Sequence, residues 1–141
     1  MRILGLSMMA GLLMVTSSLA RDADTDLATA RDVVEKQITA FLNDDVDTAY
    51  SFASPGIKKL FPEPKRFIDM VKRNYQPVYR PGNYAFGRSH SATGGKTIAL
   101  ELLITGPEGK DWRAIYILNR QDDGNYQISS VRLMKLESSA I

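Results

Sequence analysis

The segment TIALELLIT, residues 97–105, gives the clearest indication of the fold. Every second position from Ile98 to Ile104 is a large aliphatic residue. Because successive side chains of a strand point to opposite faces of a sheet, this alternation predicts a β-strand with one face in a core. Thr93-Gly94-Gly95 before the segment and Gly106–Gly109 after it have the composition of tight turns. We therefore expect an antiparallel neighbour on each side.

The neighbouring segments fit this expectation. Alternation over Tyr84–His90 predicts the strand before, and Trp112–Leu118 predicts the strand after, which is apolar on both faces and therefore expected to be central. A turn at Asp122-Asp123-Gly124 leads into a last strand, Tyr126–Leu136, where Ser129-Ser130 interrupts the alternation and predicts a bulge. The C-terminal half of the chain is thus predicted to be a meander of antiparallel strands.

The N-terminal half shows helical spacing instead. Apolar residues recur every three or four positions through a long amphipathic helix, with Leu42 widening its stripe, and Asn43-Asp44-Asp45 ends it and offers a cap for the next helix. Shorter helices are expected after Ser54-Pro55 and after Pro62-Glu63-Pro64, and Pro77, Pro81 and Gly82 predict an extended connector. The apolar stripe of the long helix consists of Leu27, Ala30, Val33, Val34, Ile38, Phe41 and Leu42. Helices followed by antiparallel strands predict an α+β fold, with the helices packed on one face of a curved sheet.

The first 20 residues have the three parts of an export signal. Arg2 supplies a positive start, Ile3–Val15 is largely apolar, and Ser18 and Ala20 provide small residues before a cut after Ala20. The stretch is too short for a comfortable membrane span, which needs about 20 apolar residues. We expect a periplasmic or secreted protein with a signal peptide over 1–20, a flexible tail over 21–26 and one α+β domain over 27–138.

The charge and the amino-acid composition of the chain limit the classes of partner and of binding site that we expect. Cleavage after Ala20 removes only Arg2 among the charged residues, which leaves 17 basic and 16 acidic side chains. A balanced charge disfavours nucleic acid as a partner. The chain has no cysteine, so disulfides and thiolate zinc sites are excluded, and with a single histidine we expect neither a metal site nor a cofactor. No segment after the leader is apolar enough to predict a membrane span.

Three further segments carry a family resemblance: DDVDTAYSFASPGI (44–57), FIDMV (67–71) and YQPVYRP (75–81). Together they resemble a bacterial family of small exported proteins known only as a domain of unknown function (family 4864), over about Val33–Leu136. The resemblance implies no activity and no site residues. The order of helices and strands is also similar to that of the cone-shaped nuclear-transport-factor-2-like superfamily, a fold also described as a cystatin-like cone. In members of that superfamily, ligands usually enter a pocket between the sheet and the helices. That similarity implies a fold and leaves the function open.

The remaining motifs are weak. His90 could act as a general base, but its setting between Ser89 and Ser91 near a glycine-rich turn favours an exposed position. Asp22, Asp24 and Asp26 imitate the start of a calcium loop, which then lacks its diagnostic glycine and glutamate. No serine nucleophile motif is present.

The aromatic residues are the best candidates for a ligand pocket. Tyrosine combines an apolar ring with a hydroxyl that needs a partner when buried, and nearby arginine or aspartate adds charge. Simple core packing is the competing interpretation of the same residues. The candidate pocket residues are Tyr50, Tyr75, Tyr79, Arg80, Trp112 and Asp69.

The sequence thus leaves three functions open. The first is non-catalytic binding of a small amphipathic ligand or a protein partner. The second is a small pocket enzyme of isomerase, dehydratase or hydrolase type that uses a buried Asp or Tyr. The third is a homodimeric structural module that uses the exposed face of the sheet.

Overall fold

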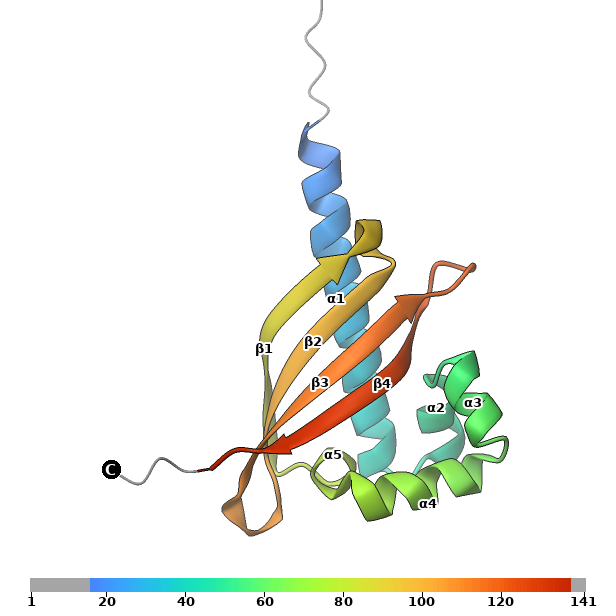
Figure 1. Ribbon diagram of the computed structural model, residues 1–141, viewed down its shortest axis with the longest axis vertical. Coiled ribbons are helices and arrows are strands. Elements are labelled where there is room, and N and C mark those ends of the chain that lie inside the picture. Colours follow the sequence, from blue (N-terminus) through green and yellow to red (C-terminus); the bar gives the residue numbers. More distant parts are fainter. Residues whose placement is uncertain (1–15, 138–141) are drawn as a thin grey trace, which may run out of the picture.

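The computed structural model describes residues 16–137 of the chain, and the side chains of residues 23–137. The first 15 residues of the expected leader lie outside the described residues. A long helix and four short ones precede four strands (Figure 1). The helices are α1 (Thr16–Leu42), α2 (Val46–Ser51), α3 (Pro55–Leu60), α4 (Pro64–Asn74) and α5 (Gln76–Tyr79).

Local capping explains where the short helices begin. The carboxylate of Asp45 accepts from the main-chain N–H of Thr48 at 3.3 Å and caps α2. The hydroxyl of Ser54 accepts from the N–H of Ile57 at 3.5 Å and caps α3, whose first residue is Pro55. A proline at the first helical position loses no hydrogen bond, because that N–H has no partner within the helix. The predicted helix starts after Asp45 and Ser54 are therefore confirmed.

Three details of the helices differ from the sequence-based expectation. Residues 21–26, expected as a flexible tail, belong to α1. The expected extended connector begins instead with the helical turn α5, in which Pro77 occupies one of the first two positions, where proline is tolerated. Leu42, expected in the apolar stripe, is 45% exposed, because it is the last residue of α1 and lies beyond the stripe that packs on the sheet.

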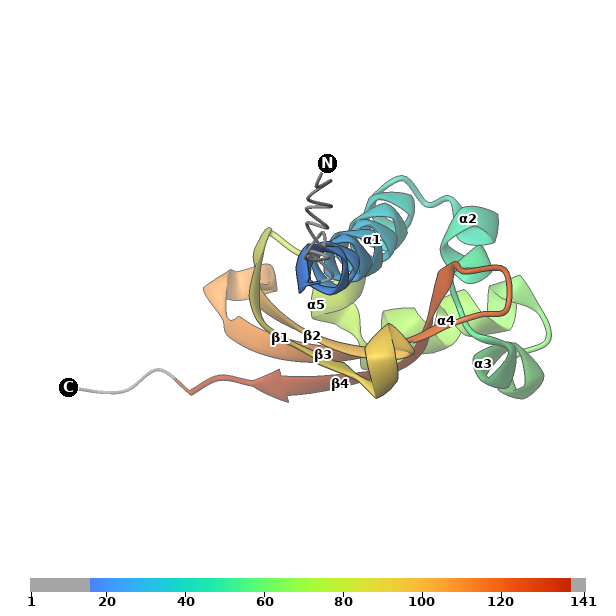
Figure 2. The same ribbon diagram turned by 90° about the horizontal axis from the view of Figure 1, so that it is seen from above.

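The sheet is a simple antiparallel meander in the order β1-β2-β3-β4. This confirms the α+β class and places the Trp112–Leu118 segment in an inner strand, as its two apolar faces predicted. Seen from above in Figure 2, α1 lies across one face of the curved sheet, a cone-like arrangement. The strands are β1 (Asn83–Ala92), β2 (Thr97–Thr105), β3 (Asp111–Arg120) and β4 (Tyr126–Lys135).

A bulge in β4 confirms the interruption seen at Ser129-Ser130. Ile128 pairs with Leu118 and Ser130 pairs with Ile117, so Ser129 is an extra residue in the strand. The Ser129 hydroxyl donates to the carbonyl of Ile117 at 3.0 Å. An extra residue of this kind bends a strand and increases its local twist.

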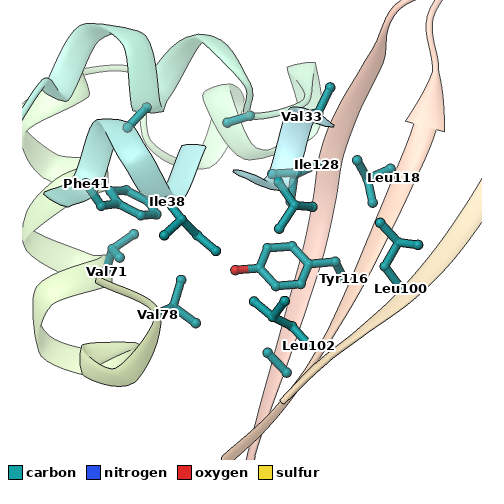
Figure 3. Packing of buried hydrophobic residues seen from close by; sticks show 14 of the residues in the cluster. Val33, Ile38, Phe41, Val71, Val78, Leu100, Leu102, Tyr116, Leu118 and Ile128 are labelled. Atoms are coloured by element: carbon teal, nitrogen blue, oxygen red, sulfur yellow. The ribbon is translucent and has the colours of Figure 1, made fainter. Parts of the chain in front are cut away.

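The core lies between α1 and the inner face of the sheet. Tyr116 of β3 is completely buried there and points toward Ile38 of α1 and Val78 of α5 (Figure 3). The alternating residues of β2 are all buried on the same face: Ile98, Leu100, Leu102 and Ile104. The middle of the cone is therefore filled with side chains.

The edge of the sheet next to the helices is partly covered. Ala53, between α2 and α3, forms a parallel bridge with Ile128, and the N–H groups of Ser54 and Ile128 donate to Ile128 and Phe52 at 2.9 and 2.8 Å. This short contact attaches α2 and α3 to the start of β4. The next three residues of β4, Ser129–Val131, border the space beside α3 and α4.

Candidate functional site

A cavity of about 430 Å³ lies beside the filled core, between the helices and the start of β4. Phe41, Val71, Val78 and Ile128, labelled in Figure 3, bring α1, α4, α5 and β4 to its wall. The complete lining is Gln37, Phe41, Ala53, Ile57, Phe61, Phe67, Met70, Val71, Asn74, Tyr75, Val78, Ile128, Ser129, Ser130 and Val131. Volumes of several hundred Å³ with mostly apolar walls are typical of sites for small molecules.

The helix α4 contributes one wall through its amphipathic pattern. Phe67, Met70, Val71 and Asn74 recur at helical spacing and lie on one face of the helix. Phe67 and Val71 are buried, whereas Met70 is half-buried and Asn74 is exposed. The wall therefore runs from the core out to the surface.

The bulge in β4 builds the opposite wall. In a regular strand consecutive side chains alternate between the two faces of the sheet. At the bulge this alternation fails, and Ser129, Ser130 and Val131 all border the cavity. The bulge thereby adds two serines to a lining that is otherwise mainly apolar.

Gln37 is the most buried polar residue of the lining. The residue is 3% exposed, and its Nε2 donates to the carbonyl of Ala49 at 3.1 Å, which fixes the orientation of the amide. We did not select Gln37 from the sequence. The available signal was its position in the apolar stripe of α1, three residues after Val34 and four before Phe41, where a polar side chain needs a reason to be buried.

The mouth of the cavity is the surface end of the α4 wall, at Met70 and Asn74, and cationic side chains lie next to it. Arg66 and Arg73 are exposed neighbours of Met70 on α4, four residues before it and three after it. Arg66 lies 3.6 Å from Glu63 in an exposed ion pair, and Arg73 donates to the carbonyl of Asp69 at 3.3 Å. Exposed pairs of this kind are weak, so both guanidinium groups can meet a ligand at the surface.

The structure brings only one of the six candidate pocket residues to this cavity. Tyr75 lines it and is half-buried. Tyr50 packs 5.5 Å from the ring of Phe67 and donates its hydroxyl to the carbonyl of Phe61 at 2.7 Å. Asp69 is half-buried on α4 and is not part of the lining.

Trp112 lies elsewhere. It is half-buried at the end of the sheet, with Tyr84 and Leu136 beside a separate shallow hollow. A side chain on Gly106 would approach its ring to 3.1 Å, so glycine at that position makes room for the indole. Trp112 packs against the edge of the core and does not face the cavity.

Tyr79 and Arg80 form a structural cluster at the end of α1. The Nη2 of Arg80 lies 2.6 Å from Asp44 Oδ1, and the Tyr79 hydroxyl donates to the same oxygen. Arg80 also donates to the carbonyl of Phe41 in the last turn of α1, and its guanidinium lies 4.1 Å from the centre of the Tyr79 ring. Hydrogen bonds from Tyr79 and then from Arg80 lower the pKa of the Asp44 carboxyl.

One buried hydroxyl lacks a partner. The Tyr116 hydroxyl has no hydrogen-bond partner among the described residues, and complete burial raises its pKa well above the ordinary value of a phenol. It is not part of the cavity lining. His90 is exposed on β1, as its sequence setting suggested.

Among residues 23–137, His, Cys, Asp and Glu side chains do not gather in groups of three that could hold a metal ion. The described helices include none with the length and apolarity needed to cross a bilayer.

The geometry defines a class of protein: a small α+β domain in which an N-terminal helix covers a curved four-stranded sheet and leaves an apolar cavity at the sheet edge. Residues 23–141 match the family described as a domain of unknown function (DUF4864), and the chain belongs to that family. This confirms the family expected from the sequence. Neither a curated protein nor a solved structure matches the chain. The relationship to the nuclear-transport-factor-2-like superfamily stays a prediction.

Proposed function

We propose that this domain binds a small, largely apolar molecule with one polar or anionic end. The observation that carries the proposal is the cavity of about 430 Å³, which has mainly apolar walls and a few polar groups. Sites for small ligands combine these two properties, since apolar area supplies binding energy and a few polar groups set orientation.

The positions of the polar groups orient the ligand. Gln37 is buried, so its amide is placed to meet a polar atom at the inner end of the molecule. Asn74 is exposed, and Arg66 and Arg73 are neighbours of the half-buried Met70 on the same helix, so an anionic group is best placed at the mouth. A guanidinium binds a carboxylate or phosphate group with two parallel hydrogen bonds.

Two alternatives have less support. In the described part of the chain, no Asp, Glu or His lines the cavity, so an acid–base enzyme at this site would depend on Tyr75. A homodimeric module would use the outer face of the sheet, where Leu103 is 39% exposed and Ile115 and Ile117 are half-buried. Both stay alternatives to the binding proposal.

The test uses a fluorescent probe that has an apolar aromatic body and a sulfonate, such as anilinonaphthalene sulfonate. We expect saturable binding to one site in the full domain. Replacing the half-buried Met70 with tryptophan should fill the mouth and weaken probe binding about tenfold or more, as expected when an apolar group loses its place in a pocket.

The matched control is Leu103→Trp, which adds the same indole on the outer face of the sheet, away from the cavity. This variant should bind the probe as the unaltered domain does. Circular dichroism melting establishes that both variants are folded. Equal probe affinity for the unaltered domain and a folded Met70→Trp variant would exclude the cavity as the site.

We also propose that the chain is exported and cut after Ala20. Residues 1–20 support this with a positive start, an apolar stretch and small residues before the cut. Within residues 23–137, the first buried residue of α1 is Ala30, so a cut after Ala20 spares the packing face of the helix. The mass of the protein purified from its native compartment tests the proposal: a chain that starts at Arg21 supports it, and one that starts at Met1 contradicts it.

A further inference from the structure

The corner between α3 and α4 exposes an apolar side chain that packing does not explain. Leu60, the last residue of α3, is 76% exposed, the highest value of any large apolar residue among residues 23–137. Its neighbours Ile57 and Phe61 are half-buried and line the cavity. Leu60 thus projects from the rim of the cavity into solvent.

Basic residues surround this leucine in the sequence. The corner reads KKLFPEPKR over residues 58–66, with a pair of basic residues on each side of Leu60 and Phe61. Residues 55–74 contain six basic and two acidic side chains, a net charge of +4, whereas the whole chain has +2. The positive charge of the protein is therefore concentrated on α3 and α4.

Two of these six cations are available to a partner. Lys59 and Lys65 are exposed and have no carboxylate within 4 Å in the described structure. Lys58 is partly used within the fold, since its Nζ lies 3.5 Å from the carbonyl of Ser51 and over the ring of Tyr50. The corner therefore presents an apolar tip between free cations.

We propose that the α3–α4 corner docks on an anionic lipid surface. Leu60 would enter the boundary between headgroups and acyl chains, while Lys59 and Lys65 would meet lipid phosphates. A bilayer surface is uniform, so a single protruding apolar side chain can insert into it anywhere without a matching surface. A stable protein interface instead needs about 1,200 Å² or more of matched surface, which a short corner with one exposed leucine does not offer.

The corner also lies beside the proposed ligand site. Ile57 and Phe61 of the same segment line the cavity, and Arg66 and Arg73 lie near its mouth. Docking would hold that mouth close to the lipid. The docking proposal goes beyond ligand binding and does not depend on it, because Leu60, Lys59 and Lys65 are not part of the cavity lining.

Flotation of the full domain with vesicles tests the proposal. Vesicles of phosphatidylcholine with about a third phosphatidylglycerol are compared with vesicles of phosphatidylcholine alone, at low and at physiological salt. We expect binding to the anionic vesicles alone, and weaker binding as salt rises, because salt screens the lysines. Replacing Lys59 and Lys65 together with glutamine should weaken vesicle binding about tenfold or more.

Leu60→Gln should weaken binding about fivefold or more while leaving the melting temperature unchanged, since the side chain is largely exposed. Leu42→Gln is the matched control, because Leu42 is also exposed but lies next to Asn43, Asp44 and Asp45. Lys36→Gln with Lys110→Gln controls for the loss of two charges elsewhere. All three control substitutions should leave vesicle binding intact.

Several outcomes would overturn the proposal. They are absence of binding to anionic vesicles at low salt, equal binding to both kinds of vesicle, and unchanged binding by Leu60→Gln. Capture by an acidic polypeptide such as polyglutamate with the same affinity, independent of Leu60, would show an electrostatic surface without lipid docking. The Met70→Trp variant separates the two proposals, since it should lose the probe and keep the vesicles.

Discussion

Arg80 and Asp44 join the end of α1 to the end of α5, with Nη2 of the arginine 2.6 Å from Oδ1 of the aspartate. The same guanidinium donates to the carbonyl of Phe41, one of the last carbonyls of α1, which has no partner within the helix. Tyr79 adds its hydroxyl to the carboxylate. Tyr79 and Arg80, which were candidate pocket residues in the sequence, therefore hold the C-terminal ends of α1 and α5 together.

This cluster predicts a particular response to acid. Hydrogen bonds from Tyr79 and Arg80 lower the pKa of Asp44 below its ordinary value of 3.8. A lowered pKa in the folded state means that the carboxylate stabilises the fold above pH 3.8, and that this contribution is lost as the pH falls through the folded pKa. Unfolding by urea between pH 5 and pH 2 measures the loss.

Asp44→Asn should flatten that dependence. The residue has φ of 53°, and asparagine tolerates this left-handed conformation as well as aspartate does. Tyr79→Phe, which keeps Asp44 and Arg80, should give an intermediate slope. An acid slope of Asp44→Asn equal to that of the unaltered protein would show that the carboxylate has no energetic role.

Tyr116→Phe should leave the stability of the protein unchanged or raise it by up to about 1 kcal/mol. A buried hydroxyl without a partner has lost its hydrogen bonds to water and gained none, so its removal has little cost. Thermal or urea unfolding checks the prediction. Destabilisation by more than about 1 kcal/mol would indicate a buried water bound to the hydroxyl.

Gln37→Met should destabilise the domain by about 1–2 kcal/mol, because the carbonyl of Ala49 loses its donor while the volume of the side chain is nearly kept. Probe affinity should also change, because the cavity loses the amide from its wall. The two readouts are separable. Lost stability with unaltered probe affinity would restrict Gln37 to a structural role.

Trp112→Ala tests the packing of the sheet end. The residue is half-buried against the core, so truncation should cost about 2–3 kcal/mol, less than the loss of a fully buried tryptophan. Probe binding should be preserved, since Trp112 is not in the cavity lining. A melting temperature equal to that of the unaltered protein would show that the indole contributes nothing to packing.

The strands could be predicted because their signals are local. Alternation over residues 97–105, the turn at Asp122-Asp123-Gly124 and the bulge at Ser129 each depend on a few adjacent residues. Local signals were weaker at α5, where Pro77 fits both an extended connector and the first turn of a helix. They were also weak over residues 21–26, which are mainly polar but belong to α1.

The candidate site was predicted less well, for a physical reason. An aromatic residue and a nearby charged residue look the same in a sequence whether they line a cavity or bind to each other. Tyr79 and Arg80 both bind to the carboxylate of Asp44. The cavity itself depends on how α4 stands away from β4, which no local pattern encodes. Of the six candidates, Tyr75 was the one whose position on the chain also faces that space.

The meander has a consequence for the synthesis of the protein. Each strand pairs with its neighbour in the chain, so the hairpins can close in the order in which they are made. The final strand, β4, supplies Ile128, Ser129, Ser130 and Val131 to the cavity and the bridge to Ala53. A chain that ends before Tyr126 lacks these four residues and the bridge, so the cavity wall forms only after β4 has been made.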